Sequence, residues 1–498
     1  MNVKTIRYQQ IDDTIFQDDN AVLELISLFE SGEINFKLAT SIDDVIMDAN
    51  MVREVNGEFL IHFDLFPEWE KKFRMEYFFE KPAILVTNGA KILIKNTDVT
   101  KFKQTLGEGV RQACINIDAF RGDLGDNNWN HSKQSAYFRY DCNKINAHNC
   151  GVIYDMTTNK DQNYSCKNCV KIEIDESIVL FYYMYVEEKV GYFVFKTNDP
   201  INHDKFLRII NATRAAFSLI SGFYIADSAY FISMQKRKKN TLTYRYENFN
   251  ETIHTKKPLL DNILYHNIPQ NKLHLTSDQF ECFVKLLYTD DELLRSCILL
   301  TQASNIDDLS KGCLAAVALE TITHKIVTKD KKDRTLIEDK KIYRQLKYEL
   351  EKALKKIKNN IEKSIYDTLK SKIGKLHEQP NSIKLESPFV ALGINLDEEE
   401  KYCISCRNHL LHGSLPKPIS ELFKSLTNEE LLKLVSNRLI MLSSMLVLKK
   451  IGYEHNIVDW GYTEIAIRRK MANFENINGI GRAHRLIGNS NQGLSTVF

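Results

Sequence analysis

The sequence predicts an α+β protein in which a β-rich N-terminal domain is followed by an all-α helical bundle. Short segments rich in β-branched and aromatic residues fill the first 200 or so positions. A helical period of three and four residues then dominates from about residue 277 to residue 452. With 498 residues the chain is too long for one ordinary core, so we expect more than one domain.

The predicted strands lie in the N-terminal half. Residues 59–63, 83–86 and 90–94 are short apolar runs bounded by turn residues. Residues 178–186 and 190–195 flank the turn Glu187-Glu188-Lys189 and form the clearest predicted hairpin. After Asn198-Asp199-Pro200 the period changes, and a helix ending near Gly222 is predicted from the repeat of Phe206, Ile209, Ile210, Thr213, Phe217 and Ile220.

The predicted boundaries divide the chain into four parts. Residues 1–235 form the β-rich domain, 236–275 a polar and basic linker, 276–455 the helical domain and 456–498 a C-terminal tail. The helix predicted at 396–413 has clear end signals, because Asn395 or Asp397 can cap it and Gly413 followed by Pro416 stops it. The other predicted helices of this half are 277–288, 291–303, 308–328, 338–373 and 428–450.

Composition limits the location and the partners of the chain. The net charge is +2, so a nucleic-acid contact is expected from a local patch and not from the field of the whole chain. We see no signal peptide and no apolar run of roughly 18 to 20 residues, so we expect a cytoplasmic protein without a membrane span. The motifs of P-loop, dinucleotide-binding, hydrolase-elbow and zinc-protease enzymes are absent, which removes the usual competing enzyme classes.

The segment Arg407-Asn408-His409-Leu410-Leu411-His412 is the most informative stretch of the sequence. An arginine on an apolar face needs a polar partner, because an unpaired buried charge costs several kcal/mol. Asn408 and His412 are four residues apart and share the neighbouring face. On a helical wheel Arg407 falls inside the apolar arc of Cys403, Ile404, Cys406, Leu410 and Leu411.

These residue types suit the cleavage of RNA without a metal ion. The 2′-hydroxyl of RNA can attack its own phosphate, and His412 can take up or deliver the proton. Arg407 can stabilise the additional negative charge of the transition state, while Asn408 positions the histidine or the phosphate. The expected products carry a 2′,3′-cyclic phosphate and a 5′-hydroxyl, and no cofactor is expected for catalysis.

The segment resembles the motif of the HEPN superfamily, which is an arginine, a polar residue that is often asparagine, a few variable residues and a histidine. Arg407, Asn408 and His412 stand at the matching places, and Gly413 follows as it often does in such proteins. The resemblance implies an all-α ribonuclease bundle that forms a homodimer, with two copies of the motif facing each other in one composite site. A dimer interface would also explain why Arg407 lies on an apolar face.

The order of the predicted domains is similar to that of the ApeA-type antiphage proteins. The similarity consists of the β-rich N-terminal domain, a helix ending in Leu219-Ile220-Ser221-Gly222 and the C-terminal HEPN domain, and it covers nearly the whole chain. It implies that the N-terminal domain senses a phage-derived trigger or regulates the ribonuclease. The HEPN domain would then cleave tRNA or another host RNA during abortive infection.

Glu320 is a candidate helper residue on the helix predicted at 308–328. It is the one acid in the second half of an otherwise apolar helix, and HEPN sites often take a polar or acidic residue from this helix. The alternative is that Glu320 faces solvent or pairs with Lys325.

A basic segment follows this helix. Residues 329–375 contain 16 lysines and arginines against 8 aspartates and glutamates. Its cations can follow the phosphates of RNA, and Tyr343 and Tyr348 can stack on bases. The alternative is a solvated helix in which glutamates alternate with lysines. The RNA-binding candidates are Lys340, Lys341, Arg344 and Lys347.

Four of the ten cysteines are close together in the N-terminal half. We expect either a structural zinc ion or ordinary reduced thiols there, because Cys166-Lys167-Asn168-Cys169 is a short zinc-type knuckle in a turn-rich region. Cys403 and Cys406 show a similar spacing, but they lie on the apolar side of a helix, where core packing is expected. The candidate zinc ligands are Cys142, Cys150, Cys166 and Cys169.

Other functions remain open at this point. The motif is short, so Arg407 and His412 can also be a paired arginine and a surface histidine at a helix end. A HEPN domain can also be catalytically inactive and serve for dimerisation or RNA binding. A third alternative is a regulatory adaptor whose β-rich domain binds a small molecule or a protein partner.

Overall fold

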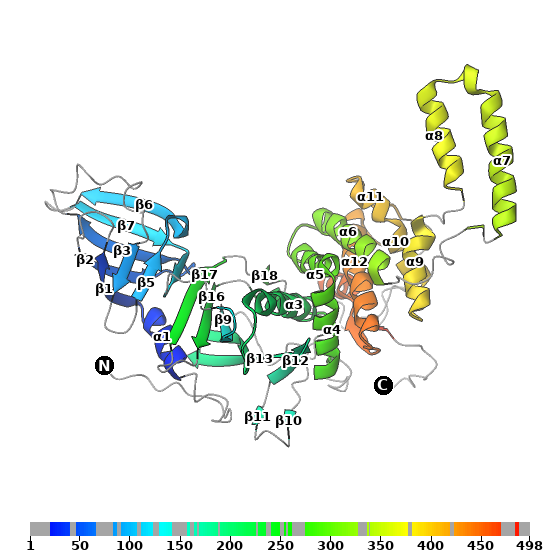
Figure 1. The fold of residues 1–498 in the computed structure, drawn as a ribbon. Helices are drawn as coiled ribbons and strands as arrows, with labels where there is room; N and C mark the ends of the chain where they lie inside the picture. Colours follow the sequence, from blue (N-terminus) through cyan, green and yellow to red (C-terminus); the bar gives the residue numbers. More distant parts are fainter. Residues whose placement is uncertain are drawn as a thin grey trace. The chain divides into compact units, whose positions relative to one another are not determined.

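The structure is a computed structural model that describes most of residues 20–487. The chain divides into two compact units, Met1–Asp290 and Asp291–Phe498 (Figure 1). The first unit contains a large antiparallel sheet and the second is helical, which confirms the predicted α+β class. Within 20–487, the residues that are not described are 40–45, 66–82, 87–90, 107–110, 123–128, 142–156, 160–163, 167–168, 188–189, 226–227, 236–240, 250–252, 255–256, 261–273, 327–335, 338, 377–380, 419–422 and 470–483.

The first unit is built on a 14-stranded sheet whose order is β12-β13-β14-β9-β16-β17-β8-β5-β4-β1-β2-β3-β7-β6. Its described strands are β1 (Glu33–Ala39), β2 (Ile46–Arg53), β3 (Phe59–Leu65), β4 (Ala83–Val86), β5 (Lys91–Ile94), β6 (Val99–Leu106), β7 (Arg111–Ile117), β8 (Ala119–Arg121), β9 (Lys133–Asp141), β12 (Cys169–Ile174), β13 (Ser177–Glu187), β14 (Val190–Thr197), β16 (Ser228–Gln235) and β17 (Thr241–Asn248). Two small strand pairs accompany it, β10 (Thr157–Asn159) with β11 (Tyr164–Cys166) and β15 (Phe223–Tyr224) with β18 (Ile253–His254).

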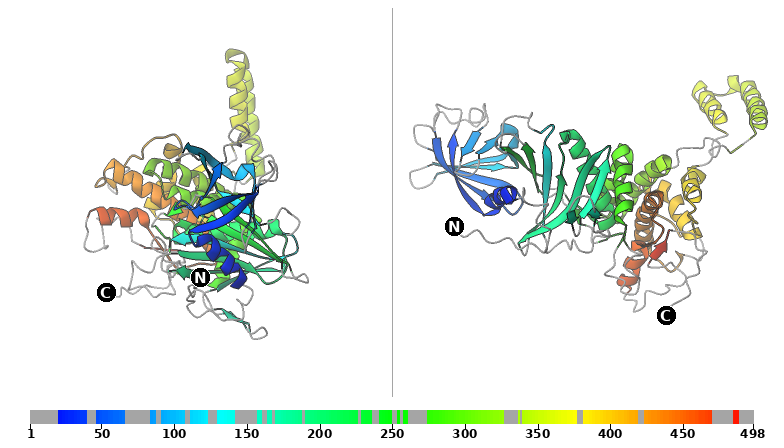
Figure 2. Two further views of the ribbon diagram at one scale, coloured as in Figure 1. Left: turned by 90° about the vertical axis from the view of Figure 1, so that its left-hand side faces the viewer. Right: turned by 60° about the horizontal axis from the view of Figure 1, so that its bottom comes forward.

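The helices of the first unit cover parts of this sheet (Figure 2). They are α1 (Asn20–Glu30), the short 3-10 helix η3 (Asn96–Asp98), α3 (His203–Ser221) and α4 (Ser277–Thr289). Phe29 of α1 packs against Phe59 and Phe120 of the sheet, with ring centroids 6.4 and 4.8 Å away. Phe217 of α3 packs against Phe181 of β13, 5.4 Å away. Such aromatic contacts bury much apolar area and attach both helices to the strands.

Several predictions for this unit are confirmed. The predicted hairpin is β13 with β14, which pair in antiparallel register. The predicted helix after Pro200 is α3, capped at its start by Asn202 and ended by Gly222 in the left-handed conformation at φ 76°. The helix α1 was not predicted, because the short β-branched and aromatic segments that fill the first 200 residues are typical of strands.

The segment 236–275, expected as a linker, differs from that expectation. Its residues 241–248 form β17, which pairs with β16 on one side and with β8 on the other. Tyr244 and Tyr246 are buried in the core of the sheet. The strand β17 was not predicted, because the basic residues before it are typical of an exposed linker. The first compact unit also includes α4 and so extends to Asp290.

The second unit is a bundle around α6 (Asp308–Ile326) and α12 (Asn428–Lys450), which pack along each other. Three predicted helices of this unit, α5 (Asp291–Ala303), α6 and α12, are confirmed within two residues at their ends, as is α4 of the first unit. Besides the helices at 340–374 described below, the other described elements of this unit are α9 (Asn381–Ala391), α10 (Glu398–Ser405), α11 (Arg407–Leu411), β19 (Asn456–Val458), α13 (Trp460–Arg468) and β20 (His484–Leu486). The segment expected as a tail thus contains α13, which packs on α12.

The helix predicted at 338–373 is two helices. The chain forms α7 (Lys340–Lys356), a 3-10 turn η8 (Lys358–Asn360) and α8 (Lys363–Gly374), which lie side by side as a hairpin (Figure 1). The hydroxyl of Tyr343 near the start of α7 donates to the carbonyl of Gly374 at the end of α8, 3.0 Å away. Two asparagines in the turn, Asn359 and Asn360, favour a break there because asparagine is a weak helix former.

The helix α12 is long and apolar enough to cross a membrane by length and composition. In this structure 94% of its most apolar stretch is buried inside the helical unit. Burial of this kind is typical of the central helix of a bundle, which is apolar on all sides.

Candidate functional site

The motif segment begins with a strongly capped helix. Asp397 caps α10 by accepting a hydrogen bond from the backbone of Glu400, whose side chain in turn accepts from the backbone of Asp397. Cys406 interrupts the helix, so the predicted single helix 396–413 is α10 followed by the short α11. His412 is the C-cap of α11, and Gly413 follows in the left-handed region at φ 68°. Glycine adopts this conformation without strain.

The apolar side of this segment attaches it to α6 and α12. Cys403, Cys406 and Leu410 are buried, as the helical wheel predicts, and burial raises the pKa of the first two thiols. A Cβ atom on Gly312 of α6 would lie 2.7 Å from Ser436 Oγ and 3.0 Å from Leu410. The glycine therefore permits a close approach of α6, α11 and α12.

Arg407 is buried and is paired within its own chain. Its guanidinium forms an ion pair with Glu320 of α6 and donates to Asn408 Oδ1 at 2.7 Å. Only 8% of the Arg407 side chain is exposed, whereas 43% of the Glu320 side chain is exposed. Burial lowers the pKa of Arg407. Its Nε atom is also buried and has no hydrogen-bond partner among the residues that the structure describes.

A dimer interface is not needed to explain why Arg407 lies on an apolar face, although the sequence suggested one. Glu320 and Asn408 provide the polar partners within one chain, so burial of Arg407 alone does not require a dimer. The alternative pairing of Glu320 with Lys325 is not formed, because Lys325 pairs with Glu292 of α5 at 3.1 Å.

The structure thus brings together Arg407, Asn408 and Glu320 from α11 and α6. Asn408, His409 and His412 are exposed at the surface of the bundle. His412 lies four residues after Asn408, and no hydrogen bond or ion pair between its side chain and Arg407 occurs in the described part of the chain. The segment Arg407–His412 thus carries a buried, charged arginine and an exposed imidazole, that is, a fixed positive charge and a proton-transfer group.

The basic candidates lie on the separate hairpin of α7 and α8. Lys340, Lys341 and Arg344 are exposed, and Lys347 forms a weak ion pair with Glu351 at 3.9 Å. Within the described residues, no hydrogen bond or ion pair connects these four cations to the motif. The hairpin also exposes apolar side chains, including Ile342, Leu346, Tyr348, Ile365 and Leu369.

The cysteine cluster can be followed only in part. Cys142 and Cys150 lie outside the described residues, and of Cys166 only its place at the end of β11 is described. Cys169 begins β12 and is buried in the hydrophobic core of the sheet. Among the described residues no group of three metal-ligating side chains is present. The structural zinc ion remains a prediction.

A buried ionic cluster, which sequence reasoning missed, holds α10 on α12. Arg438 of α12 is 3% exposed and pairs with Glu399 of α10 and with Asp459 at 3.1 Å, both of them buried. The two carboxylates raise the pKa of Arg438 against the opposing effect of its burial. An arginine within the apolar run of α12 was a visible signal, but nothing in the sequence identified its partners.

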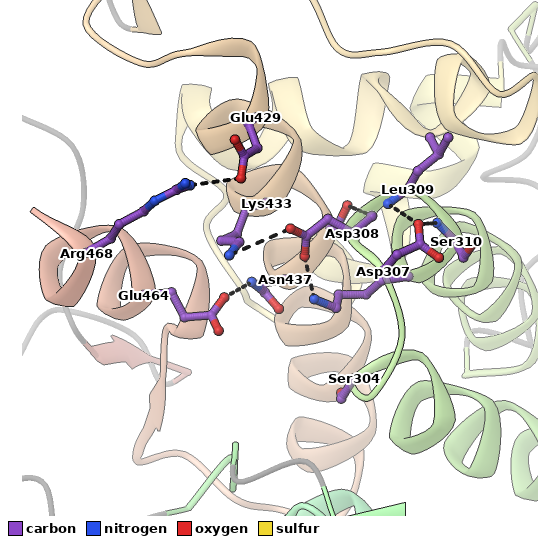
Figure 3. Close-up of polar contacts among 12 residues, drawn as sticks. Ser304, Asp307, Asp308, Leu309, Ser310, Glu429, Lys433, Asn437, Glu464 and Arg468 are labelled. Carbon is purple, nitrogen blue, oxygen red and sulfur yellow. Dashed lines mark hydrogen bonds and ion pairs between the residues drawn. The ribbon is translucent and has the colours of Figure 1, made fainter.

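Further polar contacts tie α12 to neighbouring helices (Figure 3). Lys433 lies 3.7 Å from Asp308 at the start of α6, and Asn437 donates to Glu464 of α13 at 2.8 Å. Arg468 of α13 pairs with Glu429 at 3.0 Å. These contacts fix the scaffold on which α10 and α11 lie.

No protein-family model, curated protein or solved structure gives a match to this chain.

Proposed function

We propose that the helical unit is a metal-independent endoribonuclease of the HEPN type. The observation that carries this proposal is the buried Arg407 guanidinium between Glu320 and Asn408, with the exposed His412 at the C-terminal cap of the same short helix. Arg407 stabilises negative charge on the phosphate, His412 transfers the proton and Asn408 positions the reacting group. Glu320 is the helper residue that holds the guanidinium until a phosphate competes for it.

We propose that the site is completed in a homodimer. Val317 on α6 and Leu411 on α11 are apolar, and 43% and 36% of their surfaces are exposed. They belong to the two helices that carry Glu320 and Arg407. A second chain that packs on both α6 and α11 would cover these side chains and exclude water from the arginine, which strengthens its electrostatic effect. The composite site would then combine residues of both chains.

The test uses the purified full-length chain with total RNA and tRNA in the presence of EDTA. Wild type should cut RNA and leave 2′,3′-cyclic phosphate ends. His412→Ala should lower the cleavage rate by about 100-fold or more, because general acid–base catalysis contributes that much. His409→Ala is the matched control, since His409 is an exposed histidine on the same helix. Absence of cleavage by wild type, or equal cleavage by both variants, would contradict the proposal.

A mixing experiment tests the composite site. Arg407→Ala and His412→Ala chains are inactive by themselves in this proposal. If each site takes its arginine and histidine from different chains, mixed dimers regain one intact site and part of the activity. Light scattering on the same samples reports whether dimers form.

The basic hairpin is proposed to bind the RNA. Replacing Lys340, Lys341 and Arg344 by alanine should weaken RNA binding and reduce the salt slope by about one unit per lost phosphate contact. The control replaces the exposed Lys101 and Lys103 of β6. Equal effects in both variants would mean that the hairpin makes no specific contribution.

We further propose a role in antiphage defence, in which the β-rich unit senses a phage-derived trigger or regulates the ribonuclease. Cells that express wild type should stop growing and should lose intact RNA after infection, whereas cells with His412→Ala should not. If both cultures respond alike, the nuclease has no part in the response.

A second candidate function is a non-catalytic HEPN domain that dimerises or binds RNA. The pairing of Arg407 within its own chain favours this alternative, because a satisfied arginine can serve only to hold α11 on α6. In that case Arg407→Ala would reduce stability, and wild type would bind RNA without cutting it.

A further inference from the structure

The α7–α8 hairpin exposes large aliphatic side chains within the described part of the chain. Leu354 is the one buried residue of α7, and α8 has none. Leucine and isoleucine are among the residue types most often buried, so a group of them in water marks an interaction surface. The exposed side chains, each at least 36% exposed, are Ile342, Leu346, Leu350, Ile357, Ile365 and Leu369.

The exposed aliphatic residues of α7 form one stripe. At 100° per residue Ile342, Leu346, Leu350 and Ile357 fall within an arc of about 80°. The buried Leu354 marks the side of α7 that packs on α8. It lies about 40° beyond Leu350 in the direction in which the helix turns. The stripe is therefore next to the contact with α8 and is not covered by it.

The helix α8 carries a matching stripe. Ile365 and Leu369 lie about 40° apart on the wheel. Tyr366 and Ile373 are half-buried, mark the side that faces α7 and lie about 40° to 60° beyond Leu369. Two antiparallel helices turn in opposite senses when they are viewed along one axis (Figure 1). Stripes that precede the contact on both helices thus lie on one side of the hairpin, and we call this set of six side chains the apolar face.

The charges around the apolar face are mostly positive. Residues 340–376 contain 12 lysines and arginines against 4 aspartates and glutamates, so the hairpin attracts anions. Lys356 lies about 40° from Ile342 on the outer edge of α7, and Lys372 lies about 20° from Ile365 on the outer edge of α8. Both lysines are exposed. The apolar face is therefore bordered by a cation on each side.

These features favour a lipid surface over other occupants. A second copy would bring two strongly basic hairpins together, and RNA offers little that aliphatic side chains can bury themselves in. A protein groove typically takes one amphipathic helix, whereas the apolar face is two helices wide. The anchors of protein interfaces are mostly aromatic residues and arginine, with leucine under-represented. A bilayer surface accepts aliphatic side chains and attracts cations at its anionic headgroups.

We propose that the apolar face of the α7–α8 hairpin binds the surface of an anionic lipid bilayer. The hairpin lies in the plane of the surface, and its aliphatic side chains enter the boundary between headgroups and acyl chains. Lys356 and Lys372 extend along the edges and contact the headgroups. The many cations of the hairpin prevent it from crossing the bilayer.

This inference does not rest on the proposed ribonuclease activity. Lys341 and Arg344, which are proposed above to bind RNA, lie about 140° and 160° from Leu346 on the wheel. They belong to the opposite side of α7. The two proposals therefore use different faces of the hairpin and can fail separately.

The test is sedimentation of the full-length chain with vesicles of phosphatidylcholine alone and of phosphatidylcholine with about 30% phosphatidylserine. The chain should bind the anionic vesicles at least about tenfold more tightly, and high salt should reduce this difference. Absence of binding to anionic vesicles at lipid concentrations on the order of 1 mM would overturn the proposal. Equal binding to both kinds of vesicle would overturn the anionic nature of the surface.

The combined Leu346→Ser and Leu369→Ser variant tests the apolar face. It should bind anionic vesicles at least about tenfold more weakly, because less apolar surface enters the bilayer. The control combines Ile383→Ser and Val390→Ser on α9, whose side chains are 43% and 73% exposed. Circular dichroism verifies that both variants keep their helices. Equal binding by the two variants would overturn the proposal, as would dimers that only the first variant loses in a chain that binds no vesicles.

The combined Lys356→Gln and Lys372→Gln variant tests the border and leaves the packing of the hairpin unchanged. Each lysine should contribute about fivefold to the affinity for anionic vesicles, whereas binding to neutral vesicles should not change. The control combines Lys101→Gln and Lys103→Gln on β6, where both lysines are also exposed. Unchanged affinity of the first variant for anionic vesicles would overturn the contact of these lysines with the headgroups.

Discussion

Two buried arginines of the helical unit differ in how their charges are satisfied. Arg438 is 3% exposed and faces two carboxylates that are themselves buried. Arg407 is 6% exposed, but its carboxylate partner Glu320 is partly in solvent and its Nε has no partner among the described residues. The first arrangement is closed, and the second is open on one side.

The difference separates a structural role from a functional one. In a closed ionic cluster each charge already has a buried partner, so no charge is available to a ligand. Removal of one member leaves buried charges unpaired. An arginine with a solvated partner can exchange that partner for a phosphate at small cost. We therefore assign Arg438 to the scaffold and Arg407 to the candidate site.

Arg438→Ala should have the largest effect. It leaves Glu399 and Asp459 buried without their cation, and we expect a loss of about 3–5 kcal/mol in the free energy of unfolding. Denaturant unfolding measures this loss. Arg468→Ala is the control, because its pair with Glu429 is half exposed and should contribute only about 0.2–1 kcal/mol. Equal losses in the two variants would contradict a buried cluster.

Gly312→Val tests how tightly the motif helix is held. The new side chain would displace Ser436 and Leu410, and we expect a loss of about 1–3 kcal/mol. Displacement of α11 should also lower RNA cleavage by about tenfold or more, because catalytic groups tolerate little misplacement. Gly374→Val is the matched control, since a Cβ atom on that glycine of α8 meets nothing within 4 Å. Similar losses for both would mean that α6 and α11 are not closely packed.

The ion pair between Glu430 and Arg469 combines a buried carboxylate with a partly exposed guanidinium. Its hydrogen bond from Arg469, whose side chain is 30% exposed, is the main cause that lowers the pKa of Glu430 from 4.5 to about 2. Its contribution is therefore complete above pH 4.5 and is lost as the pH falls toward 2. We expect about 1–3 kcal/mol of stability to disappear over this interval.

Glu430→Gln isolates this pH effect. The amide keeps an acceptor for the capping box at the start of α12, but it does not titrate. The variant should be less stable than wild type at pH 7 and should lose less stability between pH 4.5 and 2. Parallel pH profiles of unfolding would contradict the assigned role of the carboxylate.

Arg407→Ala should have the smallest effect on stability and the largest on activity. Glu320 stays hydrated after the change, so we expect the free energy of unfolding to change by no more than about 1 kcal/mol. RNA cleavage should fall by about 100-fold or more, because a preorganised positive charge is lost. If this variant unfolds as easily as Arg438→Ala, Arg407 belongs to the scaffold and the comparison fails.

The sequence predicted the elements whose signals are local. The apolar periods predicted α6 and α12 to within two residues of their ends, Gly222 marked the end of α3, and the helical wheel placed Arg407 on a buried face. The pairing of Arg438 with Glu399 and Asp459 could not be predicted, because contacts between residues 21 and 39 positions apart depend on tertiary packing. The break after Lys356 and the strand β17 were missed because runs of lysine look alike in helices, turns and linkers.

The helical hairpin of α7 and α8 has one further consequence. Tyr343 and Gly374 lie at its two open ends and are joined by a hydrogen bond, so the first and last turns of the hairpin lie together. An excursion of this kind adds little loop-closure entropy to the fold of the bundle, whatever its length. The hairpin can therefore be lengthened, shortened or exchanged while the bundle stays unchanged, so that the RNA-binding and cleavage roles proposed above would reside in separable parts of the unit.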